Sequence, residues 1–157
     1  MRLLQYSLCV SALIIAISST SGAQQKVFTI TISTPHPAFK AGDSIPLNIK
    51  LKNISDHTAM VALNSQDVGA GSTFEITVID SSGTEVPLRA STCGEHPCTF
   101  SGGTLPVPSG TEIHRTENLD RLFDLKPDKY TVHVKKIERD TKVVQESNTI
   151  RLTVALQ

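Results

Sequence analysis

The chain has 157 residues, with 15 Lys or Arg against 15 Asp or Glu, so its formal net charge is zero. The basic residues form no block, and we therefore expect no nucleic-acid partner. Trp is absent and aromatic residues make up only 4% of the chain, which argues against a stacking platform for sugars or bases.

Residues 1–23 are typical of a secretory signal peptide. Arg2 supplies a positive start, and residues 8–17 form an apolar run too short to span a bilayer, followed by a Ser-Gly-Ala cleavage site. Cleavage before Gln24 would leave residues 24–157 as a single exported domain, in the periplasm or the extracellular medium. The alternative is an uncleaved membrane anchor. No later hydrophobic run could span a membrane, so no membrane insertion is expected after cleavage.

Most of the remaining chain alternates between apolar and polar residues, which is the period of a strand with one buried face. The expected strands are 27–33, 45–52, 58–63, 73–80, 85–90, 111–117, 130–137 and 143–154. The alternation predicts these inward sets: Phe28, Ile30 and Ile32; Ile45, Leu47, Ile49 and Leu51, with Asn48, Lys50 and Lys52 on the other face; and Phe74, Ile76 and Val78. Residues 101–110 predict either an irregular connection or a short edge strand, and 119–125 a single helical turn. Seven to nine short antiparallel strands with regular turn signals predict an all-β fold, an immunoglobulin-like antiparallel β-sandwich.

The stretch 119–134 organises this expected fold. Pro127 fixes the first position of a tight turn, and the following strand should bury Tyr130, Val132 and Val134 while His133 faces solvent. A Tyr at the start of such a strand resembles the tyrosine corner of immunoglobulin-like sandwiches, in which the ring packs in the core and the hydroxyl bonds to upstream backbone. The alternative is an ordinary hairpin turn followed by a core Tyr.

Two cysteines would remain after cleavage, Cys93 and Cys98, and an even pair in an exported chain predicts a disulfide. So short a ring would stabilise the domain by only about 2 kcal/mol in the loop-entropy model. The longer loop 85–109 is rich in Gly and Pro, and loops on a rigid scaffold often bind partners. The alternative is a solvated loop without a partner. The residues inside the ring are the first candidates for contact: Gly94, Glu95, His96 and Pro97.

The histidines give only weak metal candidates, because no two of them stand at a metal-ligand spacing. Glu95 and His96 could form a site with His114 or His36 if folding brought them together. Exposed loop histidines are the more ordinary interpretation, and no cofactor is expected. No Gly-x-Ser-x-Gly, His-Glu-x-x-His or phosphate-binding glycine motif occurs, so the sequence predicts a protein that is not an enzyme.

Two parts of the chain suggest a family. Residues 41–47 (AGDSIPL) and 51–56 (LKNISD) resemble the opening of exported bacterial immunoglobulin-like domains, and 122–132 and 146–150 resemble their closing part. The pattern is similar to the domains that precede deuterolysin-type metallopeptidases and to proteinase-inhibitor-like domains of the Bacillus intracellular inhibitor type. The resemblance implies the fold specifically and the function weakly. Asp128 stands where these relatives often have Gly.

Three functions follow in order of preference. The first is a non-enzymatic, exported binding module whose partner is another exported or envelope protein. The second is a proteinase inhibitor that acts through the 85–109 loop, and the third is a metal-binding domain. Asn53, Ile54 and Ser55 also match a glycosylation sequon, which we interpret as a turn because the resemblance is bacterial.

Overall fold

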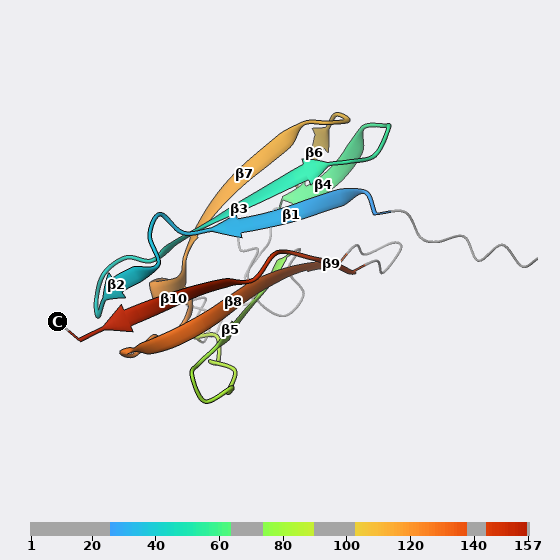
Figure 1. Cartoon of the computed structure of the whole chain (residues 1–157). Coiled ribbons are helices and arrows are strands. Elements are labelled where there is room, and N and C mark those ends of the chain that lie inside the picture. Colours follow the sequence, from blue (N-terminus) through green and yellow to red (C-terminus); the bar gives the residue numbers. More distant parts are fainter. Residues whose placement is uncertain (1–25, 64–73, 90–102, 138–143, 157) are drawn as a thin grey trace, which may run out of the picture.

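The computed structural model describes residues 26–63, 74–89, 103–137 and 144–156 (Figure 1). These residues form an all-β structure with several sheets, ten strands and one four-residue helix. The strands are β1 (Phe28–Ser33), β2 (Ala38–Lys40), β3 (Pro46–Asn53), β4 (Ala59–Leu63), β5 (Phe74–Ile79), β6 (Gly103–Val107), β7 (Glu112–Asn118), β8 (Asp128–Ile137), β9 (Val144–Glu146) and β10 (Ile150–Ala155). The helix, α1 (Leu119–Leu122), directly follows β7.

The strands lie in two layers (Figure 1). One layer contains the antiparallel sheet β1-β3-β7, in which β3 is central. The other contains the sheet β2-β10-β8-β5, with β9 paired to β8. All pairs in this second sheet are antiparallel except β2 with β10, which is parallel. Strands β4 and β6 form a separate antiparallel pair.

The core is filled by the apolar residues of the alternating strands. Their inward positions were predicted correctly in β1, β3, β5 and β8, where these side chains are at most 6% exposed. They are Phe28, Ile30 and Ile32; Leu47, Ile49 and Leu51; Phe74, Ile76 and Val78; and Tyr130, Val132 and Val134. Lys136 continues the inward row of β8, and its ammonium lies 5.1 Å from the centroid of the Phe28 ring.

The prediction of a strand at 85–90 is wrong for the part that the structure describes, residues 85–89. This part forms only two isolated bridges, Glu85 with Ile79 and Leu88 with Phe123. Pro87 lies between the two bridges, and its lack of an N–H group prevents a continuous ladder. For residues 101–110 the sequence allowed either an irregular connection or a short edge strand, and the structure has a strand there, β6. The three-residue strand β2 was not predicted from the sequence.

The predicted final strand 143–154 is interrupted between β9 and β10, where Asn148 turns toward β1. The backbone N–H of Ile32 donates to Asn148 Oδ1 at 2.8 Å, and Asn148 Nδ2 donates to the Ile32 carbonyl oxygen at 3.0 Å. Beside it, Ser147 exchanges hydrogen bonds with the backbone of Val134 through its N–H and its hydroxyl. This Asn148 clip covers the edge of β1 that does not face β3, and so ties the first layer to the second.

A second asparagine, Asn53 at the end of β3, is completely buried. Its Nδ2 donates to the carbonyl oxygens of His57 and Val107, each at 2.8 Å. Its Oδ1 accepts from the N–H of Ser55 at 2.9 Å and from the Ser55 hydroxyl at 2.7 Å. This Asn53 clip joins β3 to β6. Because both amide hydrogens are bonded inside the protein, the sequon nitrogen is not accessible to a glycosylating enzyme in the folded chain.

Tyr130 is 4% exposed, and its hydroxyl donates to the carbonyl oxygen of Lys126 at 2.8 Å. Burial is the main cause that raises the pKa of Tyr130. We expect Tyr130→Phe to lower the free energy of unfolding by about 1 kcal/mol, because it removes one net hydrogen bond and leaves the ring in place. Urea unfolding measures the change, and an unchanged midpoint would show that this hydrogen bond does not stabilise the turn.

The turn at residues 80–84, which follows β5 and returns the chain to it at Glu85, depends on ionised Asp80. One carboxylate oxygen accepts from the Ser82 hydroxyl and from the N–H groups of Ser82 and Thr84. The hydrogen bond from Ser82 is the main cause that lowers the pKa of Asp80, and one from Ser81 likewise lowers the pKa of Asp128.

This pKa direction predicts a loss of stability in acid. The folded pKa of Asp80 lies below the value of about 3.9 typical of an unfolded chain, so the stabilisation is present above that value. It is lost as the pH falls through the folded pKa. Urea midpoints measured at decreasing pH should therefore fall less steeply for Asp80→Asn, which keeps an acceptor oxygen but does not titrate. Identical slopes for the two proteins would contradict this role.

Candidate functional site

Apart from Pro46 at the start of β3, the outward side of the sheet β1-β3-β7 carries polar side chains, and we call nine of them the polar face. They alternate with the buried core residues of the same strands, so the period-two geometry turns them outward. The polar face consists of Thr29, Thr31 and Ser33 of β1, Asn48, Lys50 and Lys52 of β3, and Glu112, His114 and Thr116 of β7.

The strand register arranges the polar face in three rows across the sheet. The first row is Thr29, Lys52 and Glu112; the second is Thr31, Lys50 and His114; the third is Ser33, Asn48 and Thr116. Neighbours within a row lie about 4.8 Å apart, and rows follow one another at about 6.7 Å. The second row therefore places a lysine beside a histidine, and the third row places three short neutral side chains next to them.

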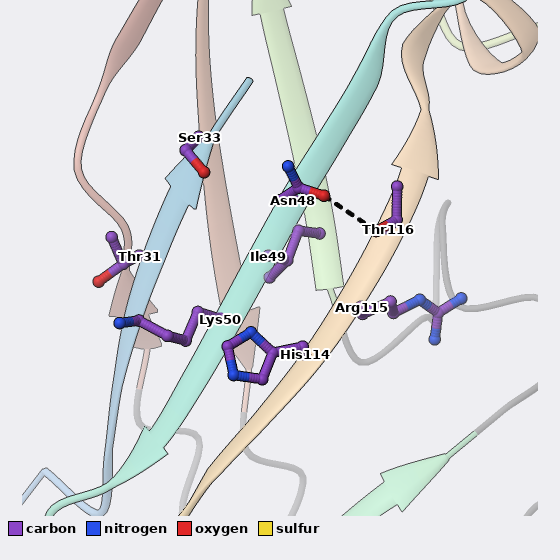
Figure 2. Close-up of a pocket in the computed structure, with 8 residues that line it drawn as sticks. All are labelled: Thr31, Ser33, Asn48, Ile49, Lys50, His114, Arg115 and Thr116. Atoms are coloured by element: carbon purple, nitrogen blue, oxygen red, sulfur yellow. Dashed lines mark hydrogen bonds between the residues drawn. The ribbon is translucent and has the colours of Figure 1, made fainter. Parts of the chain in front are cut away.

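A shallow hollow of about 320 Å³ lies over the second and third rows (Figure 2). Short side chains on Ser33, Asn48 and Thr116 leave space beside the longer Lys50 and His114. The Thr116 hydroxyl donates to Asn48 Oδ1 at 3.0 Å, and this hydrogen bond orients the two side chains of the third row toward each other. Ile49 and Arg115 also line the hollow, although both belong to the inward set of their strands; the Arg115 side chain pairs with Glu117.

Glu112 is the acidic residue of the polar face, and three cationic or imidazole groups surround it. Its carboxylate oxygens lie 3.6 Å from Lys50 Nζ, 3.9 Å from Lys52 Nζ and 3.8 Å from His114 Nε2. The side chains are partly exposed, 33% for Glu112 and 42% for Lys50. Exposed ion pairs of this length contribute only about 0–1 kcal/mol, so the two lysines remain available to another carboxylate.

The predicted disulfide and the residues of its loop lie outside the described residues. This applies to Cys93, Gly94, Glu95, His96, Pro97 and Cys98, so the disulfide and the partner loop stay predictions. The described ends of the 85–109 loop are firmly held. The N–H of Arg89 donates to the carbonyl oxygen of Leu122 at 2.7 Å, its guanidinium lies 3.2 Å from Asp124, and β6 pairs with β4.

The metal candidates are not brought together in the part of the chain that the structure describes. His114 lies on the polar face next to Glu112, and His36 packs against the ring of Phe39 with 4.1 Å between centroids. No group of three His, Cys, Asp or Glu side chains occurs among the described residues. A site that combines His114 with Glu95 and His96 also stays a prediction, because its other two residues are not described.

The sequence did not predict the polar face as a site. Alternation within 45–52 correctly turns Asn48, Lys50 and Lys52 away from the core. What places Lys50 beside His114 is the pairing of β3 with β7, strands that are more than 50 residues apart in the chain. Their charges and hydroxyls could have been recognised as one surface only with the strand order in hand.

No protein-family model matches the chain, and no curated protein matches it. Among solved structures, a β-glucosidase from Listeria innocua in complex with isofagomine has a TM-score of 0.44 and 15% identity, over 82% of this chain and 16% of the enzyme. A β-glucosidase from Erythrobacter marinus has a TM-score of 0.43 and 9% identity, over 82% of this chain and 15% of the enzyme. The chain thus spans about a sixth of the length of these enzymes.

The X-ray structure of structural-genomics target SoR45 has a TM-score of 0.44 and 10% identity, over 84% of this chain and 90% of that chain. All three similarities are too distant to assign a family or an activity. In the described ranges, none of the helical structure has the length and apolar character needed to cross a membrane.

Proposed function

We propose that this chain is an exported, immunoglobulin-like β-sandwich that binds another exported or envelope protein through the polar face and catalyses no reaction. Three features support the immunoglobulin-like assignment: two layers of mostly antiparallel strands, the buried Tyr130 ring, and the hydrogen bond from its hydroxyl to the carbonyl oxygen of Lys126. Together with Pro127, this Tyr has the geometry of a tyrosine corner.

One observation carries the binding function. Three neighbouring strands present their hydrogen-bonding side chains over a hollow in the sheet surface. Strands hold the backbone and Cβ atoms of these residues in fixed positions, so a partner that binds there orders no backbone and loses less affinity to entropy than it would on a mobile loop. A flat sheet face would lack this difference in height, which arises because the side chains of the third row are shorter than Lys50 and His114 in the second row.

The carboxylates of the turns support a role without catalysis. Asp80, Asp120 and Asp128 each accept a hydrogen bond from a backbone N–H group and thereby fix a turn or a strand end. Hydrogen bonds lower the pKa of Asp80 and of Asp128, so the ionised form of these two is used in the structure itself, whereas a general acid or base would need to exchange its proton with a substrate. These contacts therefore favour a scaffold over a catalytic centre.

The test is retention of a partner on immobilised residues 24–157. Envelope and secreted fractions of the source organism are passed over the native chain and over a Ser33→Gln/Thr116→Gln variant, which fills the hollow without changing charge. We expect the native chain to retain a protein that the variant does not retain. Thr149→Gln, an exposed substitution outside the polar face, is the matched control and should bind as the native chain does.

Two results would contradict the proposal. Equal retention by the native chain and the filled variant would remove the polar face as the binding surface. A reproducible hydrolytic activity that disappears on replacement of one Ser or His would show that the protein is an enzyme.

The inhibitor alternative is supported by the resemblance and by the anchored ends of the 85–109 loop, at Arg89 and in β6. It predicts inhibition of an extracellular peptidase, weakened by Cys93→Ser/Cys98→Ser. A survey of such peptidases without inhibition at micromolar protein would count against it.

A further inference from the structure

The polar face also carries information about the chemistry of its partner, and this inference rests on the proposed function. We propose that the polar face binds an extended, acidic segment of the partner protein, whose carboxylates at alternate positions meet Lys50 and Lys52. The hollow lies on the side of Lys50 away from Lys52, and it receives the polypeptide that continues beyond the carboxylate at Lys50.

The charge of the hollow favours an anionic group. Lys50 and His114 line it, and no Asp or Glu belongs to its lining. The nearest acidic residue of the polar face, Glu112, lies in the neighbouring row and is shared between Lys50, Lys52 and His114. The two lysines and the one glutamate give the polar face a formal net charge of +1, so a carboxylate that approaches the hollow is attracted.

The contacts of Glu112 leave both lysines able to take a new partner. The two distances of 3.6 and 3.9 Å are long for charge-assisted hydrogen bonds, which form at about 2.7–2.9 Å. Each lysine side chain is more than two-fifths exposed, so its ammonium can turn toward solvent. A carboxylate from a partner can therefore bind Lys50 while Glu112 stays close to Lys52 or His114.

The spacing of the lysines favours a polypeptide in extended form. Lys50 and Lys52 are two residues apart on β3, which separates them by about 6.7 Å along the strand. An extended peptide places side chains i and i+2 at the same separation, so acidic residues at alternate positions match both lysines. The third row supplies hydroxyl and amide groups of Ser33, Asn48 and Thr116 for the backbone of the same peptide.

An acidic polysaccharide shares the carboxylate chemistry but fits the polar face less well. Sugar rings are commonly held by stacking on aromatic side chains, and none of the nine residues is Phe, Tyr or Trp. The polypeptide is therefore the partner that we assign, and the polysaccharide becomes one arm of the test.

The test uses a fluorescent peptide with Glu at alternate positions separated by Ser, and its binding to residues 24–157 is followed by anisotropy. We expect Lys50→Glu to weaken binding at least about tenfold, because attraction becomes repulsion. Ser33→Gln, which fills the hollow without changing charge, should weaken it about threefold. Raising NaCl from about 50 to about 300 mM should weaken it as well. Unfolding midpoints verify that each variant is folded.

The controls separate a site from a general charge effect. Lys129→Glu makes the same charge change at an exposed position of β8, in the other layer, and should leave binding unchanged. The same peptide with Gln in place of Glu should not bind. Equal losses for Lys129→Glu and Lys50→Glu, or equal binding of the Gln peptide, would overturn the inference. Binding of polygalacturonate in preference to the Glu peptide would also overturn it.

The natural partner distinguishes failure of this inference from failure of the proposed function. If the partner retained by the native chain is retained equally by Lys50→Glu but lost with Ser33→Gln/Thr116→Gln, the polar face binds it without the acidic segment. If the native chain itself retains no protein, the proposed function fails and the inference fails with it.

Discussion

Replacement of Asn53 by Ala is expected to lower the free energy of unfolding by about 3 kcal/mol or more. The substitution removes all four hydrogen bonds of the Asn53 clip at a position with no solvent exposure. The carbonyl oxygen of Val107 and the N–H of Ser55 would then lose their partner, while the carbonyl oxygen of His57 keeps the hydrogen bond from the Ser55 hydroxyl at 3.0 Å. An unsatisfied buried group costs about 1–3 kcal/mol, so two of them together make this loss large.

The measurement is urea unfolding of Asn53→Ala with two comparison variants. Asn48→Ala removes an exposed asparagine from the same strand and should change stability by no more than about 0.5 kcal/mol. Asn53→Asp keeps the acceptor for Ser55 but places a carboxylate oxygen against two carbonyl oxygens, so it should be at least as destabilising as Ala. Similar midpoints for Asn53→Ala and Asn48→Ala would show that the Asn53 clip does not hold β3 to β6.

Replacement of Asn148 by Ala is expected to cost about 2 kcal/mol, since it removes the two hydrogen bonds that this side chain makes with Ile32. The effect is also local. The Asn148 clip protects the N–H of Ile32 at the edge of β1, so the variant should exchange this amide hydrogen faster than the native protein does. An uncovered strand edge is also a pairing site for a second chain, and the variant should self-associate more readily at high concentration.

Hydrogen exchange and unfolding together test the Asn148 clip. Thr149→Ala changes the next exposed residue, which has no part in the clip, and should alter stability by no more than about 0.5 kcal/mol. The amide of Leu51, bonded within the centre of the sheet, serves as the internal reference for exchange. Loss of stability without faster exchange at Ile32 would place the role of Asn148 somewhere other than at the edge of β1.

The sequence contained enough information for the strands and their buried faces, because period two depends only on neighbours along the chain. Phe28, Ile30 and Ile32 lie inward as predicted, and so do Tyr130, Val132 and Val134. The prediction failed in two places for different reasons. At β2 a long-range parallel pairing with β10 decides the conformation, and at 85–90 the missing N–H of Pro87, a local signal, outweighs the alternating pattern.

The two clips show the same limit for polar residues. Asn53 and Asn148 stand in segments rich in turn-forming residues, and this local sequence predicts only that their side chains bond nearby backbone groups. In the structure Asn53 also reaches Val107, 54 residues away, and Asn148 reaches Ile32, 116 residues away. The polar face could not be predicted from the sequence for the same reason, because its rows form only when three strands that are distant in the chain pair with one another.

The most direct measurement for the proposed function is a chemical-shift map of isotopically labelled residues 24–157 with the protein that they retain. If the polar face binds this partner, the largest shift changes will be at Thr31, Lys50, His114 and their neighbours in the three rows, and the β8 residues around Lys129 will not change. Changes confined to the 85–109 loop, with the polar face unaffected, would contradict the proposed function and favour the inhibitor alternative.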